Sequence, residues 1–427
     1  MAPLAWLPCL ALLALLPPQL LLTVAFVRRL RSAEPTVSDA PCLPTEVVLC
    51  LRGADAGLDQ LLALLARQRY RPWRLRLVVD SSADPAWPLV QRRVLALDAD
   101  PLTTWTEARI ETLAARPRCG SLKGAALRQA LLSLAADTEV VALIDADASI
   151  GEHWLATLVG ACQGEGLGAV SGNRWYDPGA DSVRGTVRAL WATGAIVMMS
   201  AFAIPWGGTL AIRREVIDGS PWLELLRTSL CEDTALTRPL VQGGWRHRFV
   251  PQLISVETAE GPPLLPLTRW IGRQLVMARL HHPGWPLVAA HGLATSLLLL
   301  LVSIQVLLAV GIARWDLLAL ALATLAGYEL ASLALAAWIS RATARVLALA
   351  GRPLRPWSAR RWLWQLLLLP LTQLVYGWAL LLAITARRVE WRGVIYRLGR
   401  EGVWIERLSA FPFDPAGSSL TASDLLR

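Results

Sequence analysis

The chain has almost no lysine. Lysine and arginine together number 42, and only Lys123 among them is lysine. The lysine ammonium is a compact, flexible point charge, whereas the arginine guanidinium is a rigid planar fork, so the two are not interchangeable at a binding site. A chain that uses arginine everywhere else and keeps one lysine predicts a site role for Lys123, with a phosphate or carboxylate partner. Chance survival of a single lysine is the alternative.

Several other signals are missing. The six cysteines include no Cys-x-x-Cys spacing, so disulfides and structural zinc are not expected. No basic stripe with interleaved aromatic residues occurs, which argues against a nucleic-acid partner. The net charge of +9 comes mostly from arginines near predicted membrane boundaries, and we attribute it to contact with anionic lipid. The sequence contains neither an internal repeat nor a low-complexity tract.

Apolar residues, in contrast, are abundant and unevenly placed. They make up 54% of the chain, and nearly uncharged stretches run over residues 4–27, 286–312, 317–339 and 362–385. Each is close to the ~20 residues that cross a bilayer core. No basic residue precedes the first stretch, and Arg28, Arg29 and Arg31 follow it, which is typical of an anchor rather than a cleaved signal peptide. We expect an integral, multi-pass membrane protein.

The positive-inside rule predicts that residues 31–285 and the arginine-rich loop over residues 341–361 are cytoplasmic. The C-terminal arginines then conflict with the rule, because a full crossing by residues 362–385 would place Arg387 and Arg388 outside. Pro370 lies inside that stretch and could divide it into a re-entrant pair of half-helices, which would return the tail to the cytoplasm. We predict re-entry.

The region between the first two apolar stretches alternates between strand-like and helix-like segments. Short apolar runs over residues 46–51, 75–79 and 140–144 predict buried strands, and residues 168–175, 208–213 and 247–256 predict further strands. Helical periodicity occupies residues 58–68, 123–136 and 151–162. Strands that alternate with helices predict an α/β fold, with a doubly wound, mostly parallel sheet.

Carboxylates follow two of these strands directly. Asp80 ends the run over residues 75–79, and Asp145 and Asp147 end the run over residues 140–144. Ligands of open α/β sheets bind beyond the carboxyl ends of the strands, so these side chains are expected at one edge. Two hard oxygen donors at Asp145 and Asp147 suit Mg²⁺ or Mn²⁺ bridging to a diphosphate. Solvated aspartates at the end of a strand are the alternative.

A second acidic pair, Glu232 and Asp233, precedes an apolar helical segment. Asp233 could be an ordinary helix N-cap. It could instead be a general base, a role that needs a carboxylate held near an acceptor hydroxyl. No Ser-His-Asp-like set is evident. Further along, Arg269, Arg273 and Arg279 interleave with apolar residues, which predicts an interfacial amphipathic helix.

The motifs Asp80, the Lys123 segment, Asp145-x-Asp147, Glu232-Asp233 and Arg269-Trp270 occur in an order that resembles the membrane-bound family 2 glycosyltransferases. Within that group, the anchor, cytoplasmic domain and C-terminal apolar stretches look most like the family 21-like ceramide glucosyltransferases and their bacterial relatives. The tail segment over residues 390–397 also resembles the basic-aromatic sequence that follows the last membrane segment of those enzymes. The resemblance covers nearly the whole chain and implies a GT-A-like, Rossmann-like fold with one N-terminal and about three C-terminal transmembrane or re-entrant helices.

The resemblance also implies roles for individual residues. Asp233 would be the catalytic base with Glu232 beside it, and Asp145 and Asp147 would hold the metal. The expected donor-binding residues are Asp80, Lys123, Asp145, Arg269, Trp270, Arg273 and Gln274. The expected acceptor-side loop contains Trp206, Gly207 and Gly208. Pro266 stands where the family's Gln/Arg-x-x-Arg-Trp motif has Gln or Arg, so that motif is incomplete, and Arg273 and Gln274 could supply the missing contacts.

These implications lead to a division of the chain and to a function. We expect an anchor over residues 1–30, a cytoplasmic catalytic domain over 31–260, an interfacial helix over 261–285, membrane helices over 286–386 and a basic-aromatic tail over 387–427. The expected activity is inverting transfer of a hexose, with glucose first, from a UDP-sugar to a ceramide- or diacylglycerol-like membrane lipid. The alternatives are a polysaccharide or polyprenyl-phosphate glycosyltransferase, a nucleotidyltransferase that releases pyrophosphate, and a non-catalytic membrane scaffold.

Overall fold

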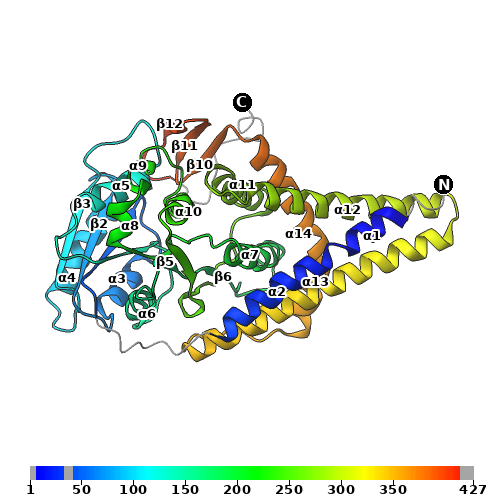
Figure 1. Ribbon diagram of the computed structural model, residues 1–427, viewed down its shortest axis with the longest axis horizontal. Helices are drawn as coiled ribbons and strands as arrows, with labels where there is room; N and C mark the ends of the chain where they lie inside the picture. The colour runs from blue at the N-terminus through cyan, green and yellow to red at the C-terminus, as the bar shows by residue number, and fades with distance from the viewer. Residues whose placement is uncertain (1–5, 33–41, 414–427) are drawn as a thin grey trace.

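A sheet domain and a set of long helices make up the protein (Figure 1). The computed structural model describes residues 6–32 and 42–413. The first five residues of the predicted anchor, residues 33–41 of the predicted catalytic domain and residues 414–427 of the predicted tail therefore lie outside the described residues. The four long apolar helices that the sequence predicts, one N-terminal and three C-terminal, are confirmed.

The central sheet has seven strands in the order β3-β2-β1-β4-β7-β5-β8. Strands β1 to β4 run parallel, β7 runs antiparallel to both its neighbours, and β5 and β8 are parallel. This confirms the predicted α/β class with a mostly parallel sheet. The strands are β1 (Thr45–Leu51), β2 (Trp73–Val79), β3 (Glu107–Thr112), β4 (Val140–Ile144), β5 (Leu167–Ser171), β7 (Thr209–Arg213) and β8 (Arg246–Phe249).

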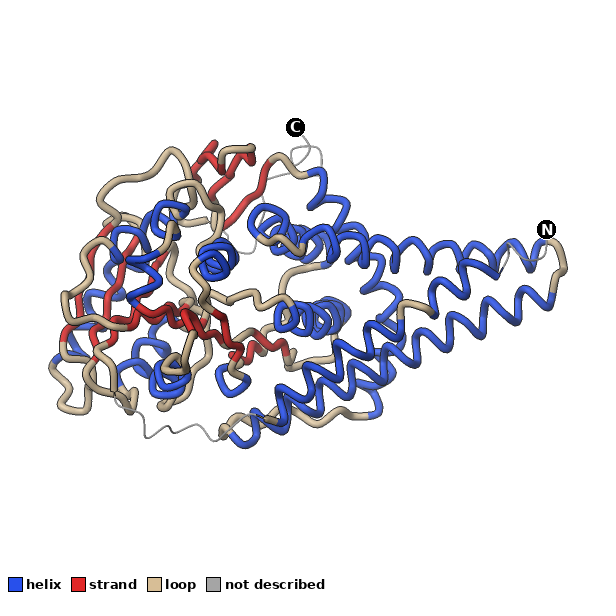
Figure 2. Tube along the Cα trace, viewed as in Figure 1, coloured by secondary structure: helices blue, strands red, loops and turns tan. Residues whose placement is uncertain are grey.

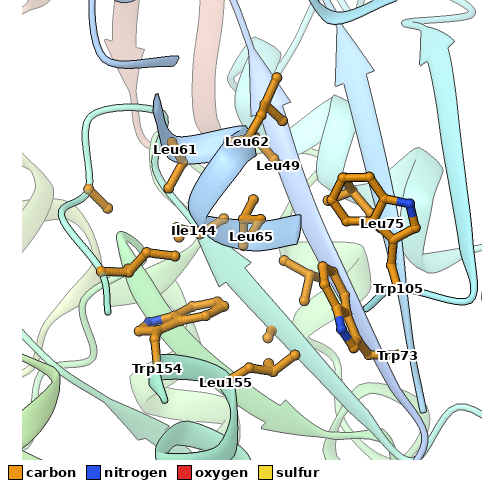
Figure 3. Packing of buried hydrophobic residues seen from close by; sticks show 14 of the residues in the cluster. Leu49, Leu61, Leu62, Leu65, Trp73, Leu75, Trp105, Ile144, Trp154 and Leu155 are labelled. Carbon is orange, nitrogen blue, oxygen red and sulfur yellow. The ribbon is translucent and has the colours of Figure 1, made fainter. Parts of the chain in front are cut away.

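Helices cover both faces of this sheet because its inner strands are apolar on both sides. Val47 and Leu49 of β1 point into one core and Val48 into the other. Figure 3 shows the first core, where Leu62, Trp73 and other large side chains meet. The helices on this face are α3 (Leu58–Ala66), α4 (Ala86–Asp98) and α6 (Trp154–Ala161), and those on the other face are α5 (Leu122–Leu131), α8 (Arg214–Gly219), α9 (Trp222–Leu225) and α10 (Asp233–Gln242).

Two predicted strands are each divided in the structure. Residues 168–175 form the end of β5 and then β6 (Arg174–Tyr176), and residues 247–256 form part of β8, a 3₁₀ turn (Pro251–Leu253) and β9 (Ser255–Glu257). The chain leaves the main sheet at Gly172, whose backbone lies against Leu253 too closely for a side chain. Strands β6 and β9 then pair with each other in a small parallel sheet. This departure moves Arg174 beyond the edge of the main sheet.

Three sets of helices project away from the sheet domain in one direction (Figure 2). They are α1 (Leu7–Leu13) with α2 (Leu16–Arg31), α12 (Trp285–Gly311) and α13 (Trp315–Leu349). Helix α12 runs outward from the domain and α13 returns along it (Figure 1). Leucines cover much of their outer surfaces, as expected for helices in contact with lipid.

Three more helices lie between the sheet domain and the projecting helices. These are α7 (Val183–Ala201), α11 (Leu264–His281) and α14 (Ala359–Thr385), and they pack against one another. The predicted division of α14 at Pro370 into two half-helices is wrong, because the helix continues through this residue. Pro370 removes one backbone hydrogen bond, but buried side chains on both sides of it, such as Leu369 and Thr372, hold the helix against its neighbours.

Both ends of α14 nevertheless contact the sheet domain. Near its start, Arg361 forms an ion pair of 2.7 Å with Asp177. After its end, the chain forms a three-stranded antiparallel sheet, β10 (Arg388–Trp391), β11 (Val394–Gly399) and β12 (Gly402–Leu408). Its last strand accepts a hydrogen bond of 2.7 Å from Gly120 N to Val403 O. The tail therefore returns to the sheet domain after an unbroken helix.

This arrangement predicts which positions face the same side of the membrane. In a Cys42→Ser background, which removes the exposed cysteine of the described chain, single cysteines would replace the exposed residues Glu152, Arg400 and Asp316. We expect a membrane-impermeant maleimide to label positions 152 and 400 from the same side of sealed vesicles, and position 316, at the far end of α13, from the other. Labelling of positions 400 and 316 from one common side would contradict the placement of the tail.

Candidate active site

One large cavity connects the sheet edge with the projecting helices. Its volume is about 1120 Å³, somewhat above the ~300–1,000 Å³ of common ligand pockets. At one end it is lined by residues that follow β1, β2 and β4, including Asp80 and Asp145, and at the other by apolar residues of α2, α7 and α13 such as Leu22 and Ile339. A polar end and an apolar end therefore belong to one continuous cavity.

Asp145 and Asp147 lie at the polar end, directly after β4, and each is paired with a cation. Lys123, from the first turn of α5, donates to Asp145 Oδ1 at 2.6 Å. Arg174 holds both oxygens of Asp147, at 2.6 and 2.7 Å, and also Glu257 at 3.0 Å. Burial works to raise the pKa of Asp147, but the guanidinium of Arg174 outweighs it and lowers the pKa to about 2. Asp147 is therefore ionised at any working pH.

Lys123 also joins the second acidic pair to the first. Its ammonium lies 2.7 Å from Glu232 Oε1, in addition to its contact with Asp145. Burial raises the pKa of Glu232 to about 6 against the opposing effect of Lys123. For Lys123 itself, burial favours the neutral amine, but the two carboxylates raise its pKa well above the ordinary value. The lysine thus joins both acidic motifs.

Asp233 begins α10 and is fixed from both sides. Its Oδ2 accepts a hydrogen bond of 2.9 Å from Gly207 N, and its Oδ1 accepts one of 2.5 Å from Thr234 N. Gly207 has no room for a side chain because Glu232 packs against it, and Gly208 packs in the same way against the ring of Trp206. The glycines thus set the position of the acidic pair, and of these three loop residues only Trp206 lines the cavity.

Asp80 is buried at the end of β2. Arg52 donates to its Oδ2 at 2.5 Å, and Arg116 reaches the same oxygen at 3.2 Å. Its other oxygen, Oδ1, is buried and has no hydrogen-bond partner among the described residues. A buried acceptor without a partner is costly, so this oxygen is suited to a ligand that donates a hydrogen bond.

Helix α11 contributes four predicted residues to the cavity: Arg269, Trp270, Arg273 and Gln274. Trp270 packs edge-on against Tyr176 and Trp191. Arg273 lies over the ring of Trp391 at 5.6 Å and has no acidic partner within the described chain. Burial, followed by the charge of Arg392, lowers the pKa of Arg273 to about 10, which leaves it a cation at neutral pH.

Several cavity residues were not predicted as site residues. Asp55 follows β1 as Asp80 follows β2, so the strand-end pattern could have identified it. Arg392, 337 positions later, donates to both oxygens of Asp55 at 2.8 and 3.0 Å. Neither this pairing nor that of Arg174 with Asp147 follows from any local pattern. The predicted residues that line the same cavity are Asp80, Lys123, Asp145, Asp147, Trp206, Glu232, Asp233, Arg269, Trp270, Arg273 and Gln274.

The acidic residues can be tested for their fit to a divalent cation. The described residues contain no cluster of three or more His, Cys, Asp or Glu side chains that would enclose a metal ion. Asp145 and Asp147 supply carboxylate oxygens on one loop after β4, and the Asp147 side chain is 41% exposed. Mg²⁺ and similar ions are commonly bound by one or two carboxylates, with water and substrate phosphate as the other ligands. The pair fits such an ion. Without a metal ion, the partners of these carboxylates are Lys123 and Arg174.

Comparison with known proteins gives one family. The pattern that defines glycosyl transferase family 21 matches residues 10–404 of the chain. No curated protein matches the chain at a significant level.

Solved structures give more distant likenesses. The mannosyltransferase PcManGT from Pyrobaculum calidifontis, solved with GDP-Man and Mn²⁺, is 19% identical over 88% of this chain and 99% of its own, with a TM-score of 0.48. Glucosyl-3-phosphoglycerate synthase from Mycobacterium tuberculosis, solved with Mn²⁺, UDP-glucose and phosphoglyceric acid, is 17% identical over 56% of this chain and 76% of its own, with a TM-score of 0.34. Both TM-scores lie below 0.5, so neither structure bears on the substrate of this chain.

The bridging position of Lys123 predicts a pH-dependent loss of stability. The pKa of Glu232 is raised from 4.5 to about 6 on folding, so its contribution to stability is present below its ordinary pKa and is lost as pH rises through about 6. Lys123→Met would raise this pKa further and destabilise the fold at neutral pH by roughly 3 kcal/mol. We expect its thermal unfolding midpoint to fall more steeply than that of the wild type between pH 6 and 8.

The double variant Lys123→Met with Glu232→Gln provides the control, because it removes the buried charge as well as its partner. Its midpoint should lose most of the added pH dependence. A wild-type pH profile for Lys123→Met alone would contradict the assignment of Lys123 as the partner that stabilises Glu232.

Proposed function

Because the chain belongs to glycosyl transferase family 21, we propose that it transfers a hexose from a UDP-sugar to the hydroxyl group of a membrane lipid, with inversion at the anomeric carbon. Glucose is the first candidate sugar, and a ceramide- or diacylglycerol-like lipid is the first candidate acceptor.

The observation that carries the proposal is the continuity of the cavity. One space is lined by Asp145, Asp147 and Asp233 at the sheet edge and by Leu22 and Ile339 among the projecting helices. A water-soluble donor needs the first environment and the hydrocarbon chain of a lipid needs the second. A lipid with its chain among the helices and its hydroxyl group near Asp233 would use both ends at once.

The donor would be held at the sheet edge. The unpaired oxygen of Asp80 suits the imide N–H of uracil or a ribose hydroxyl. Asp145 and Asp147 would hold a divalent cation, Mg²⁺ or Mn²⁺, which when bound neutralises the leaving diphosphate. The remaining donor contacts would come from Lys123 and from the four cavity residues of α11, Arg269, Trp270, Arg273 and Gln274.

Asp233 would act as the general base. As the lipid hydroxyl attacks the anomeric carbon, its proton passes to the Asp233 carboxylate, the new C–O bond forms, and the bond to the diphosphate oxygen breaks with its electron pair on UDP. The hydrogen bonds from Gly207 N and Thr234 N hold this carboxylate in a fixed orientation, which general-base catalysis requires. A single displacement inverts the configuration, so an α-linked donor gives a β-glycoside.

The membrane orientation follows from the arginines. Arg28, Arg29 and Arg31 end α2 beside the sheet domain, and the positive-inside rule places such a cluster in the cytoplasm. The catalytic domain and the C-terminal sheet would then both be cytoplasmic, with α1 and α2, α12 and α13 crossing the bilayer. Helix α14 would lie at the interface.

The direct experiment is mass spectrometry of lipids after incubation with the detergent-solubilised protein, Mg²⁺ or Mn²⁺ and separate UDP-hexoses. We expect one new hexosyl-lipid with one preferred donor, in amounts that fall when the metal is chelated. Release of UDP without any glycolipid would argue against a lipid acceptor, and absence of both UDP and glycolipid with every donor would argue against the activity.

Two substitutions separate the proposed base from the proposed metal ligand. Asp233→Asn should lower the transfer rate by roughly 10²–10⁴-fold, the usual contribution of a general base, with donor binding retained. Asp147→Ala should weaken metal-dependent donor binding about tenfold or more. Nucleotide binding and single-turnover rates would be measured side by side for both variants.

Asp218→Asn is the matched control, because Asp218 is an exposed aspartate of the same domain, paired with Arg214. It should behave as the wild type in both assays. If Asp233→Asn and Asp147→Ala lost binding and turnover to the same extent, the proposed division of roles would be wrong.

A further inference from the structure

The C-terminal sheet inserts an arginine into the polar end of the cavity. Arg392 is at the tip of the hairpin between β10 and β11, where Trp391 pairs with Val394. Its side chain lines the cavity, although the hairpin belongs to a different sheet from the strands that carry Asp80 and Asp145. The tail therefore forms one wall of the polar end.

The backbone at this tip is unusual for an arginine. Arg392 has φ +49° and Gly393 has φ +69°, the combination required by a two-residue type I′ hairpin turn. Asn, Asp and Gly are the residues that favour the first position of this turn, and a left-handed conformation costs other residues roughly 1 kcal/mol. An arginine at this position is thus disfavoured by the local backbone, so its side chain must account for its presence.

The hairpin tip is held firmly on the end of β1. Arg392 Nη1 donates to Arg52 O at 3.0 Å, and Arg52 Nε donates back to Arg392 O at 2.9 Å. Arg52 is in turn paired with Asp80. The bond from Arg52 Nε fixes the backbone of the tip at the end of β1, and Arg52 O holds the Arg392 guanidinium beside it.

A second guanidinium lies close to it. Arg273 of α11 lies over the ring of Trp391, the residue that precedes Arg392, and the charge of Arg392 contributes to the lowered pKa of Arg273. Two like charges that face one cavity repel each other. Asp55 compensates only Arg392, and Arg273 forms no ion pair within the described part of the chain. The pair Arg273 and Arg392 therefore lacks one negative charge.

The contact with Asp55 is also one that an anion can replace. Burial raises the pKa of Asp55 in spite of Arg392, and the nearby Asp147 and Asp145 act in the same direction. Ionised Asp55 is thus held at a cost, and an incoming anion would offer Arg392 an alternative partner without disturbing the bond from Arg52 Nε to Arg392 O. Guanidinium groups bind phosphoryl oxygens through two parallel hydrogen bonds, which makes phosphate the best match.

We propose that Arg392 and Arg273 together form a phosphoryl-binding clamp, which grips the diphosphate of the sugar donor and makes the C-terminal sheet part of the donor site. The clamp rests on the proposed function for the identity of the donor. The same chemistry would suit the phosphate of a phosphorylated lipid acceptor, and nucleotide binding distinguishes the two sources. Loss of the tail would accordingly remove half of the clamp.

The backbone at position 392 supplies an unusually clean test. Arg392→Asn removes the guanidinium but creates Asn-Gly, the sequence most favourable to this turn. The more favourable turn offsets part of the loss of the contacts with Asp55 and with Arg52 O, so we expect the thermal stability of the ligand-free full-length protein in detergent to fall only modestly. Arg397→Gln is the matched control, because Arg397 is an exposed arginine of the same hairpin that lies over Trp404, outside the cavity.

Binding of UDP, UMP and uridine would be measured by calorimetry with Mg²⁺ and again with a chelator. Arg392→Asn should weaken UDP binding about 10–100-fold, the effect expected for charge-assisted hydrogen bonds. It should weaken UMP binding less and leave uridine binding unchanged. Arg273→Gln should likewise weaken the binding of UDP most, of UMP less and of uridine not at all. The effect of Arg392→Asn on UDP binding should persist with the chelator, because the clamp is independent of the cation.

The other outcomes have definite meanings. If UDP binding is unchanged while KM for a phosphorylated lipid rises, the donor assignment is overturned and the clamp binds the acceptor. If neither changes, or if Arg392→Asn unfolds at lower temperature and weakens all three ligands equally, Arg392 is only a structural partner of Asp55. Were the wild type to bind GDP instead of UDP, the proposed donor would be wrong, and the clamp would be tested by the same comparison between GDP, GMP and guanosine.

Discussion

Charge compensation at the carboxyl ends of the strands is the constraint on which the site depends. A parallel sheet brings the ends of β1, β2 and β4 to one edge, and the carboxylates that follow them would repel one another there. Each is stabilised by a cation from another part of the chain. Lys123 comes from α5, Arg174 from the small sheet and Arg392 from the C-terminal hairpin. The same pairs that keep the acids ionised also fasten these elements around the cavity.

The layer of α7, α11 and α14 separates the sheet from the projecting helices but does not close the cavity. The polar edge of the sheet therefore opens toward the apolar helices. Trp191 of α7 and Trp270 of α11 pack together at its wall. Helix α14 is apolar enough to span a membrane, yet Arg361 at its start and the sheet after its end both contact the sheet domain. Apolar character alone therefore does not decide whether a helix crosses.

The parts of the fold and site that the sequence could predict are those with a local cause. Buried strands are recognisable from apolar runs, and the convergence of Asp80 and Asp145 follows from the geometry of parallel strands. Strand β3 was missed because it is an edge strand, with a half-exposed, charged sequence. The prediction of a break at Pro370 was wrong because proline disfavours an isolated helix, whereas the packing of α14 against its neighbours holds this helix together.

Pairings between residues far apart in the sequence have no local signal, and most of the unpredicted contacts of the site are of this kind. Arg392 and Asp55 lie in different sheets, and Arg174 reaches Asp147 only because the chain leaves the main sheet at Gly172. No periodicity links such residues. The scarcity of lysine was informative for a different reason: it marks a choice between two cations, and such a choice matters where a compact charge must contact two acids at once.

The same balance of charge bears on the order of binding. Lys123 is shared between Asp145 and Glu232, and Arg174 between Asp147 and Glu257. A diphosphate that arrived without a cation would add negative charge beside these four acids, which costs free energy in a medium of low dielectric constant. Charge balance therefore favours joint binding of the cation and the donor, and it gives the unpaired Arg273 a partner only when the diphosphate is present.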